Sequence, residues 1–528
     1  MVGLYYNKKQ KRGQNFLPLL KIMKEKNKLK QSGVLMPIFS LPSKFGIGDF
    51  GKESFNFIDI LSLSGQSFWQ ILPLVQTGYG NSPYSSICST SFNPYFISIE
   101  KLYEMGLITK KELKSSVCKQ KYIDYEFLFR TRYSLLNKAF NRFDINSLDF
   151  LRYVQSKESL DYALFMAIKE KDNQKHFYEW EDGLKNREVK ALNKFKKENA
   201  DRVLFWQFVQ FIAKKQWFEL KKYANKKGVK ILGDMPLYVA LDSVDVWANK
   251  NLFKLDENFA PKKVAGVPPD YFCKDGQLWG NPVYDYAEHQ KTGFSWWAER
   301  LKKALKVYDY VRIDHFRALD RYYEIDSDKK NAKDGEWVKV PSKKLFNAIH
   351  KKVDKTKIIA EDLGLIDEGV RNLLKEVDYP GMKVLSFAFN GDKDNLYLPE
   401  NIPFNSVCYT GTHDNDTLKG LINGHNQWEK YNFCSGVKNS LTKLGLKRKI
   451  DRTESLINAI IELGLKSNAK LFIIPVQDLL KKDSQYRINQ PGVVRNQNWA
   501  IKFNKSEISI KRFSKLKTLT QKYDRQKD

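Results

Sequence analysis

Short apolar runs recur along the chain, and each of them ends in Gly, Pro or polar residues. Runs of this length with a turn signal at the end are typical of buried β-strands. Segments with the apolar spacing of a helix lie between most of the runs, for example at 52–65, 341–353 and 366–377. The eight runs are GVLMPIFSL (33–41), QSFWQILPL (66–74), VKILGDMPLYV (229–239), YDYVRIDHF (308–316), KIIAEDLG (357–364), MKVLSFAF (382–389), SVCYTGTHD (406–414) and KLFIIPVQD (470–478).

Eight strand-like runs that alternate with helices predict an α/β fold, a (β/α)8 TIM barrel with large inserted helical and loop subdomains. We expect residues 33–505 to form this barrel and to carry any catalytic site. Two insertions exceed the needs of a bare barrel: about 98–228, rich in Lys, Leu and aromatics and expected to be helical, and about 240–300, rich in Pro, Gly and Trp. Residues 1–32 are interpreted as a basic N-terminal extension and residues 506–528 as a basic C-terminal tail.

The chain carries a net charge of +29, from 90 Lys and Arg against 61 Asp and Glu. Such an excess could serve nucleic-acid binding. Lysine rather than arginine dominates, however, and no arginine-rich cluster or known nucleic-acid module is recognisable. We therefore expect lysines spread over solvated surfaces and no nucleic-acid partner. No stretch approaches the roughly 18 consecutive apolar residues of a membrane span, so no membrane association is expected.

Two features of the sequence favour a cytoplasmic location. The first 32 residues hold nine basic residues and one acid, Glu25, but no apolar core of a secretory signal. The five cysteines are scattered and form no CxxC pair, which argues against a disulfide framework or a zinc site and for a reducing compartment.

Polar residues stand repeatedly at the ends of the predicted strands, where barrel enzymes place their active sites. Asp234 belongs to the third run, Asp314 to the fourth and Glu361 to the fifth, and the seventh run ends in His413 and Asp414. One carboxylate at a strand end usually has a structural role. Acids at the ends of several neighbouring strands indicate a catalytic site instead. Metal enzymes usually add histidines at ligand spacing, and the chain has only six His, so we expect no metal.

Carboxylates arranged in this way suit glycosyl transfer. A retaining enzyme needs a nucleophilic carboxylate and an acid/base carboxylate about 5–5.5 Å apart, a separation that neighbouring strand ends can hold. Arg312 precedes Asp314 by two residues, so both side chains share one face of the strand and the cation can keep the nucleophile ionised. Glu361 follows the apolar residues 358–360 and would face Asp314, and both features raise the pKa of an acid.

The sequence resembles the amylomaltase family, the 4-α-glucanotransferases of glycoside hydrolase family 77 in the α-amylase clan. The resemblance covers roughly residues 33–503, and its blocks occur in the family's order. These blocks are SLPSKFGIGDFG (40–51), WQILPLVQTGYGNSPYSS (69–86), SFNPYFIS (91–98), GDMPLYVALDSVDVW (233–247), GVPPDYFCKDGQLWGNPVYDY (266–286), VRIDHFRAL (311–319), IIAEDLG (358–364), YPGMKVLSFAF (379–389), YTGTHDNDT (409–417), IPVQDLL (474–480) and RINQPG (487–492).

The resemblance implies roles for the strand-end residues. Asp314 matches the nucleophile that forms a covalent glucosyl-enzyme intermediate, and Glu361 matches the general acid/base. Asp414 matches the third carboxylate, which would grip the hydroxyls of the distorted donor sugar, and Arg312 and His413 match side chains of the same subsite.

Further positions match the family's sugar-binding surfaces. Asp234 matches a polar group of the donor subsites. The loops of the sugar-binding rim are matched by Tyr79, Asp270, Gln277, Trp279 and Asn281. The implied substrates are α-1,4-glucans and maltooligosaccharides, with glucose or another glucan as acceptor, and no cofactor is implied.

Three departures from the family pattern leave the carboxylates untouched: Ala318 replaces a common Gly, Tyr323 a common Trp and Ile488 a common Met. They bear on chain-length preference rather than on the reaction. Two other functions stay open at this point. A plain retaining α-glucan hydrolase would share the first half-reaction, and a basic nucleic-acid-binding protein could have inherited an inactive barrel. The oligomeric state and the role of residues 1–32 are left open by the sequence.

Overall fold

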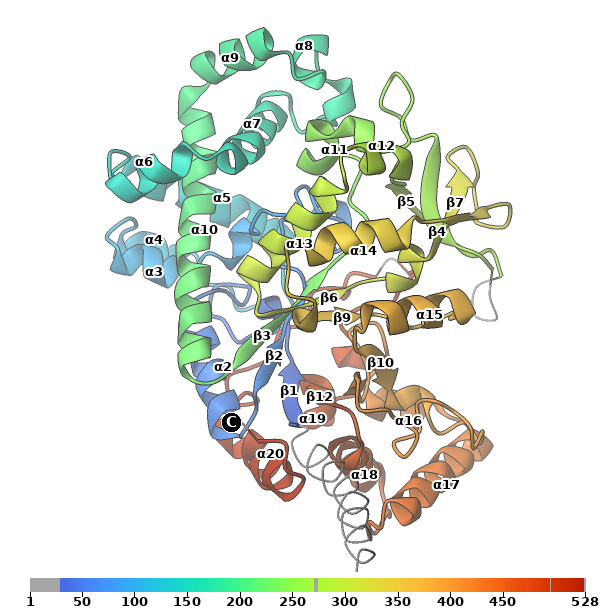
Figure 1. Cartoon of the computed structure of the whole chain (residues 1–528). Helices are drawn as coiled ribbons and strands as arrows, with labels where there is room; N and C mark the ends of the chain where they lie inside the picture. Colours follow the sequence, from blue (N-terminus) through green and yellow to red (C-terminus); the bar gives the residue numbers. More distant parts are fainter. Residues whose placement is uncertain (1–28, 270–273, 494, 527–528) are drawn as a thin grey trace, which may run out of the picture.

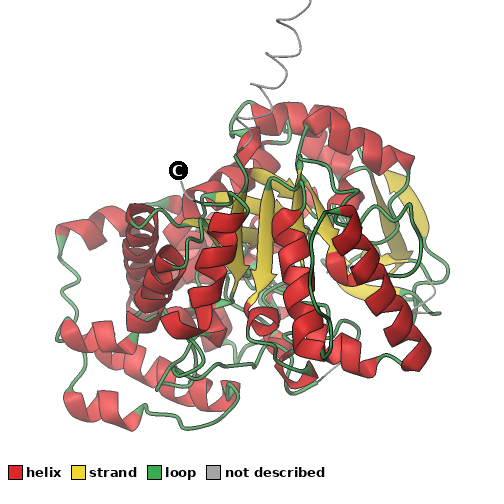
Figure 2. Cartoon of the chain, turned by 90° about the horizontal axis from the view of Figure 1, so that it is seen from below, coloured by secondary structure: helices red, strands yellow, loops and turns green. Residues whose placement is uncertain are grey.

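Eight parallel strands form a closed barrel at the centre of the molecule, with helices around it (Figures 1 and 2). The computed structural model describes residues 29–269, 274–493 and 495–526. The barrel strands are β1 (Gln31–Leu35), β2 (Phe68–Gln70), β3 (Lys230–Met235), β6 (Tyr310–Ile313), β9 (Ile358–Ala360), β10 (Gly381–Val384), β11 (Ser406–Tyr409) and β12 (Leu471–Pro475). Each overlaps one of the eight predicted runs, although β1 begins two residues and β10 one residue before its run, and the (β/α)8 prediction is confirmed.

The strands follow one another around the barrel in chain order. β1 pairs with both β2 and β12, and the ring closes between β9 and β10, where the Ala360 amide donates to the Pro380 carbonyl at 2.9 Å. Alternate residues of a strand point to opposite faces. On β3, Leu232 belongs to the cluster that fills the barrel, whereas Ile231 packs with the layer under the helices. Asp234 therefore continues the inward face of β3 beyond Leu232.

The outer helices connect one strand to the next. Their apolar faces cover the barrel, as on α15, where Val370, Leu373 and Val377 are buried. The helices that precede or follow the barrel strands are α2 (Lys52–Leu63), α13 (Ser295–Val307), α14 (Ser342–His350), α15 (Glu368–Val377), α16 (Leu418–Gly424), α17 (Gln427–Lys443) and α18 (Thr453–Lys466).

The segment at about 98–228 is built from helices, at the left and top of Figure 1. Its last helix, α10 (Ala200–Lys226), is long enough to pack on this subdomain with its first half and on the barrel beside β3 with its second half. The shorter helices are α3 (Ile99–Glu104), α4 (Lys110–Ser115), α5 (Tyr125–Asn141), α6 (Leu148–Val154), α7 (Lys157–Lys171), α8 (Asp182–Lys185) and α9 (Val189–Glu198).

A second, antiparallel sheet lies beside the barrel, at the right of Figure 1. It has the order β5-β4-β7-β8 and joins two parts of the chain that are separated by β6. Its strands are β4 (Lys263–Val267), β5 (Gln277–Pro282), β7 (Arg321–Asp326) and β8 (Glu336–Lys339). The region at about 240–300 therefore contributes two strands, together with α11 (Val244–Ala248) and α12 (Tyr286–Lys291), and is more than a loop.

The C-terminal segment is docked against the barrel. Within 506–528, helix α20 (Ile510–Lys522) buries Phe513 and Leu516 against α2 and α18. Arg525 is fully buried and donates to the carbonyl oxygens of Leu465, Gln31, Ala469 and Ser467. Of the expected N-terminal extension, residues 1–28 lie outside the described residues. No helix in the described ranges is long and apolar enough to span a membrane.

Candidate active site

The candidate site lies at the carboxyl ends of neighbouring barrel strands. Asp234 on β3 pairs in register with Arg312 on β6, and Ile313 on β6 pairs with Ala360 on β9. The ladder continues one residue further, because the amide of Asp314 donates to Met235 at 3.1 Å and the amide of Glu361 donates to Ile313 at 3.0 Å. Neighbouring strands lie about 4.8 Å apart, so Asp314 and Glu361 project from adjacent positions.

Arg312 is the buried cation of the site, and its side chain is only 4% exposed. Its Nη2 atom donates to Asp234 Oδ2 at 2.5 Å and to Asp314 Oδ1 at 3.0 Å. Tyr84 completes this group, since its hydroxyl donates to the same Asp234 oxygen at 2.6 Å and lies 3.3 Å from Arg312 Nη2. A buried guanidinium is stable only with such partners, and this one fixes Asp314 relative to β3.

Glu361 is held by backbone amides instead of by a cation. Its Oε2 accepts from the His315 amide at 2.7 Å, and its Oε1 accepts from the Leu363 amide at 2.9 Å. His315 adopts a left-handed backbone conformation, with φ of 48°, which turns its amide toward Glu361. Burial raises the pKa of Glu361 to about 7. Burial also raises the pKa of Asp314, but the guanidinium of Arg312 opposes that rise.

Asp414 and His413 follow β11 on the other side of the barrel mouth. Asp414 Oδ1 accepts from the Asn489 amide at 2.6 Å, and Arg487 donates to the Asp414 backbone carbonyl at 2.6 Å. His413 Nε2 lies 3.3 Å from Asp414 Oδ2. Burial lowers the pKa of His413, which favours the neutral imidazole. The ring of Tyr84 stacks on His413 with centroids 5.1 Å apart and planes within 9°, and so joins Asp414 to the Arg312 group.

Three of the five predicted rim residues, Trp279, Gln277 and Asn281, lie on β5 beside this site. Trp279 on β5 is 37% exposed, and its ring meets His315 edge to face at 4.8 Å. Gln277 accepts a hydrogen bond from Trp279 Nε1 at 3.1 Å. The Asn281 amide donates to the Val239 carbonyl at 2.9 Å, which ties β5 to the segment after β3.

The other two predicted rim residues, Tyr79 and Asp270, lie partly or wholly outside the described residues. The backbone of Tyr79 begins the short 3-10 turn η2 (Tyr79–Asn81), and its side chain is not among those described. Asp270 lies outside the described residues. Over the described ranges, no group of three or more His, Cys, Asp or Glu side chains is arranged to hold a metal ion.

Comparison with known proteins agrees with the chemistry of these side chains. The model of the glycoside hydrolase family 77, 4-α-glucanotransferase, matches residues 36–507. The chain belongs to the 4-α-glucanotransferase family. It is 41% identical over 498 residues to the 4-α-glucanotransferase of Clostridium butyricum, covering 93% of this chain and 100% of the relative. With that of Aquifex aeolicus it shares 42% over 479 residues, covering 90% and 96%.

A solved structure shows the same architecture. The amylomaltase of Streptococcus agalactiae, determined in complex with acarbose, superposes with a TM-score of 0.88 at 37% identity, over 94% of this chain and 100% of that one. The resemblance found in the sequence is thereby confirmed, and the protein is a 4-α-glucanotransferase that acts on α-glucans.

Several residues of this 4-α-glucanotransferase site were not singled out from the sequence. Tyr84 stands in the quoted block 69–86, and Asn489 and Arg487 stand in the block RINQPG. Trp499, whose ring lies 5.9 Å from that of His413, follows that block by seven residues. The signal that could have found Tyr84 and Asn489 was their place inside family blocks, because neither lies on a barrel strand.

Proposed function

We propose that the protein transfers a segment of an α-1,4-glucan to the 4-hydroxyl of glucose or of another α-1,4-glucan by two successive displacements at Asp314. The observation that carries this assignment is the contrast between two neighbouring carboxyls. Asp314 contacts the guanidinium of Arg312 at 3.0 Å, whereas Glu361 accepts only from the backbone amides of His315 and Leu363.

In the first step, an Asp314 carboxylate oxygen attacks C1 of the donor sugar and the bond from C1 to the glycosidic oxygen breaks. Glu361 gives its proton to that oxygen, and the leaving chain departs with a free 4-hydroxyl. The two adjacent acids titrate together. The nearby cation selects Asp314 as the ionised member of the pair, which leaves the proton on Glu361.

In the second step, an acceptor 4-hydroxyl attacks C1 of the glucosyl-Asp314 ester, the ionised Glu361 takes its proton, and the bond from C1 to Asp314 breaks and frees the carboxylate. The new glycosidic bond has the original α configuration, because two inversions retain it. Asp414, held by Asn489, and neutral His413 would bind hydroxyls of the reacting sugar. Asp234 would act through Arg312, to which it is bonded at 2.5 Å, and not on the sugar.

The rim would guide donor and acceptor chains. Trp279 offers a partly exposed ring beside His315, and Gln277 orients the indole. Tyr79, Asp270 and Asn281 keep their proposed places in this rim on the strength of the sequence resemblance. A rim that retains an acceptor and excludes water favours transfer over hydrolysis.

The roles of the two acids can be separated with α-glucosyl fluoride, a donor whose leaving group needs no protonation, and azide as an external nucleophile. Glu361→Ala should form its glucosyl-enzyme and release α-glucosyl azide. Asp314→Gly should instead let azide attack directly and release the β-anomer. Equal products from the two variants, or azide products without any dependence on these residues, would overturn the assignment.

We also propose that the enzyme works in the cytosol. The support is the chemistry of its thiols: burial raises the pKa of Cys88 to about 11 and that of Cys408 to about 12, so both stay as unreactive thiols. Such buried thiols suit a reducing compartment. Cell fractionation followed by a transfer assay tests this location, and activity outside the cytosolic fraction would contradict it.

A further inference from the structure

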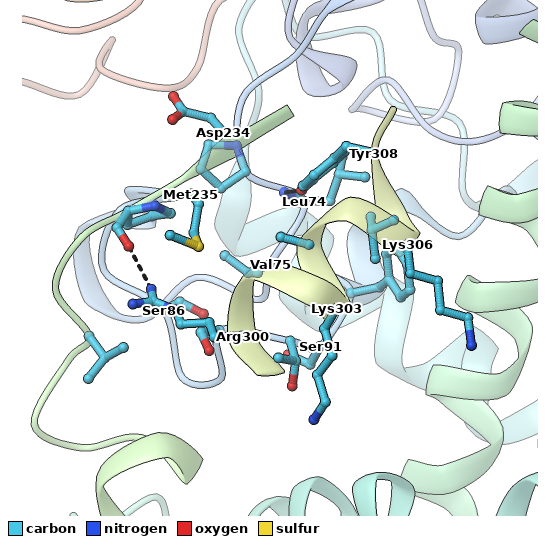
Figure 3. Close-up of a pocket in the computed structure, with 18 of the residues that line it drawn as sticks. Leu74, Val75, Ser86, Ser91, Asp234, Met235, Arg300, Lys303, Lys306 and Tyr308 are labelled. Carbon is cyan, nitrogen blue, oxygen red and sulfur yellow. Dashed lines mark hydrogen bonds between the residues drawn. The ribbon is translucent and has the colours of Figure 1, made fainter. Parts of the chain in front are cut away.

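A cavity lies beside the end of β3, between helices α10 and α13 (Figure 3). It encloses about 90 Å³ and is lined mainly by apolar groups from the ends of β2 and β3. Leu74, Val75, Met235 and Tyr308 are each at most 9% exposed. An apolar cavity of about 150 Å³ is known to bind benzene. This smaller cavity, which opens at one side, therefore has room for at most a single ring or a short aliphatic chain.

Cationic side chains surround the opening of this cavity. Lys214 comes from α10, and Arg300, Lys303 and Lys306 come from α13. Figure 3 shows Lys303 and Lys306 reaching outward from the helix. The one acidic residue in the lining is Asp234, and its carboxylate points away from the cavity toward Arg312. The charge at the opening therefore favours an anion.

The lining also holds a buried polar atom that has no partner within the described part of the chain. This atom is the Nε of Arg300, a residue that is 5% exposed. The other guanidinium nitrogens of Arg300 are occupied by the carbonyls of Leu237 and Pro236. A buried donor without a partner is costly, so a polar group of a ligand would be stabilised here.

We propose that this cavity binds a small apolar carboxylate, aromatic or short aliphatic, with its hydrocarbon part against Met235 and Val75 and its carboxylate toward Arg300 and the lysines of α13. The cavity adjoins the glucan site without being part of it, because Tyr84 and Asp234 border the cavity while their polar groups bond in the Arg312 group. Met235 faces the cavity, whereas the preceding residue, Asp234, belongs to the Arg312 group.

Isothermal titration calorimetry of the full chain with benzoate tests this proposal, with benzyl alcohol as the neutral ligand of the same shape. We expect benzoate to bind one molecule per chain and more tightly than benzyl alcohol. Lys303→Glu should weaken benzoate binding by roughly twofold to 30-fold, because it replaces one attraction by a repulsion of similar size. The matched control is Lys302→Glu on the same helix, which is exposed and does not line the cavity. It should leave the affinity unchanged.

A second variant locates the binding. Ala304→Phe on α13 puts a ring into the cavity and should abolish saturable benzoate binding. Transfer activity on maltotriose shows whether this variant is folded; if it is inactive, the Lys303 and Lys302 pair decides alone. The proposal is overturned by no saturable binding to the wild type, by equal losses in Lys303→Glu and Lys302→Glu, or by undiminished binding in an active Ala304→Phe variant.

Discussion

The hydroxyl of Tyr84 should matter to catalysis more than to folding, and Tyr84→Phe tests this at one oxygen atom. The hydroxyl donates to Asp234 Oδ2 at 2.6 Å, and the same oxygen holds Arg312 at 2.5 Å. Burial and the carboxylate of Asp234 raise the pKa of Tyr84 well above its ordinary value, so the hydroxyl remains a donor at working pH. The phenylalanine ring keeps the stacking on His413 and removes only the hydrogen bond.

The size of the effect follows from the type of bond. A hydrogen bond to a charged group contributes about 1.5–3 kcal/mol. The unfolding entropy of 528 residues is about 1.1 kcal/mol/K, so this loss lowers Tm by only about 1–3 °C. The same energy lost from the transition state lowers kcat/KM by roughly tenfold to 150-fold. We expect a loss inside this range, because without Tyr84 the guanidinium of Arg312 can shift relative to Asp314.

The assay compares Tyr84→Phe with Tyr379→Phe. Tyr379 is also buried, and its hydroxyl contacts His350 at 2.7 Å just before β10, at the opposite end of the barrel from the site. Initial rates of maltotriose disproportionation and thermal unfolding are measured for both variants. We expect both variants to lose a similar, small amount of Tm and only Tyr84→Phe to lose much of its kcat/KM. That result supports a catalytic role of the Tyr84 hydroxyl. A kcat/KM within twofold of wild type in Tyr84→Phe would refute it.

Three further outcomes are expected. Because Glu361 must be protonated to start the reaction and its pKa is about 7, kcat/KM measured against pH should fall tenfold per unit above pH 7, and Glu361→Gln should abolish this limb; an unchanged limb in that variant assigns it to another group. Asn489→Ala removes the 2.6 Å donor to Asp414 and should lower kcat/KM about tenfold in the maltotriose assay with little change in Tm, whereas an unaltered rate would contradict its positioning role. Arg525→Ala leaves buried carbonyls unpaired and should lower the free energy of unfolding by about 3 kcal/mol in urea titrations. Arg512→Ala, on the exposed side of α20, is the control, and equal stability of the two variants would show that the hydrogen bonds of Arg525 do not stabilise the fold.

The barrel and its carboxylates were predictable because both leave local signals. Each strand is a short apolar run, and Asp314 and Glu361 stand at the point where such a run ends in polar residues. The pairing of Arg312 with Asp314 was likewise visible, since residues two apart on a strand share a face.

The rest of the site depends on contacts between distant segments. Tyr84 follows β2 and Asn489 follows β12, and only closure of the barrel brings them to Asp234 and Asp414. No local sequence pattern marks such residues, because a loop lacks the regular periodicity that shows which way a side chain points on a helix or strand.

Two structural elements were hidden by their composition. The antiparallel sheet of β4, β5, β7 and β8 is made of strands of four to six residues within Gly- and Lys-rich sequence. The sequence of helix α20 is dominated by basic residues and was interpreted as a tail. Phe513 and Leu516, three residues apart, nevertheless form a narrow apolar stripe that packs against α2 and α18.

Chromatography of the products that the pure protein and Asp314→Asn form from maltotriose tests whether Asp314 carries the transfer. We expect the wild type to give a ladder of longer maltooligosaccharides together with glucose and maltose, and the variant to give no ladder. Glucose and maltose without longer products would show a hydrolase. A full ladder from Asp314→Asn would contradict the role of Asp314 as the nucleophile.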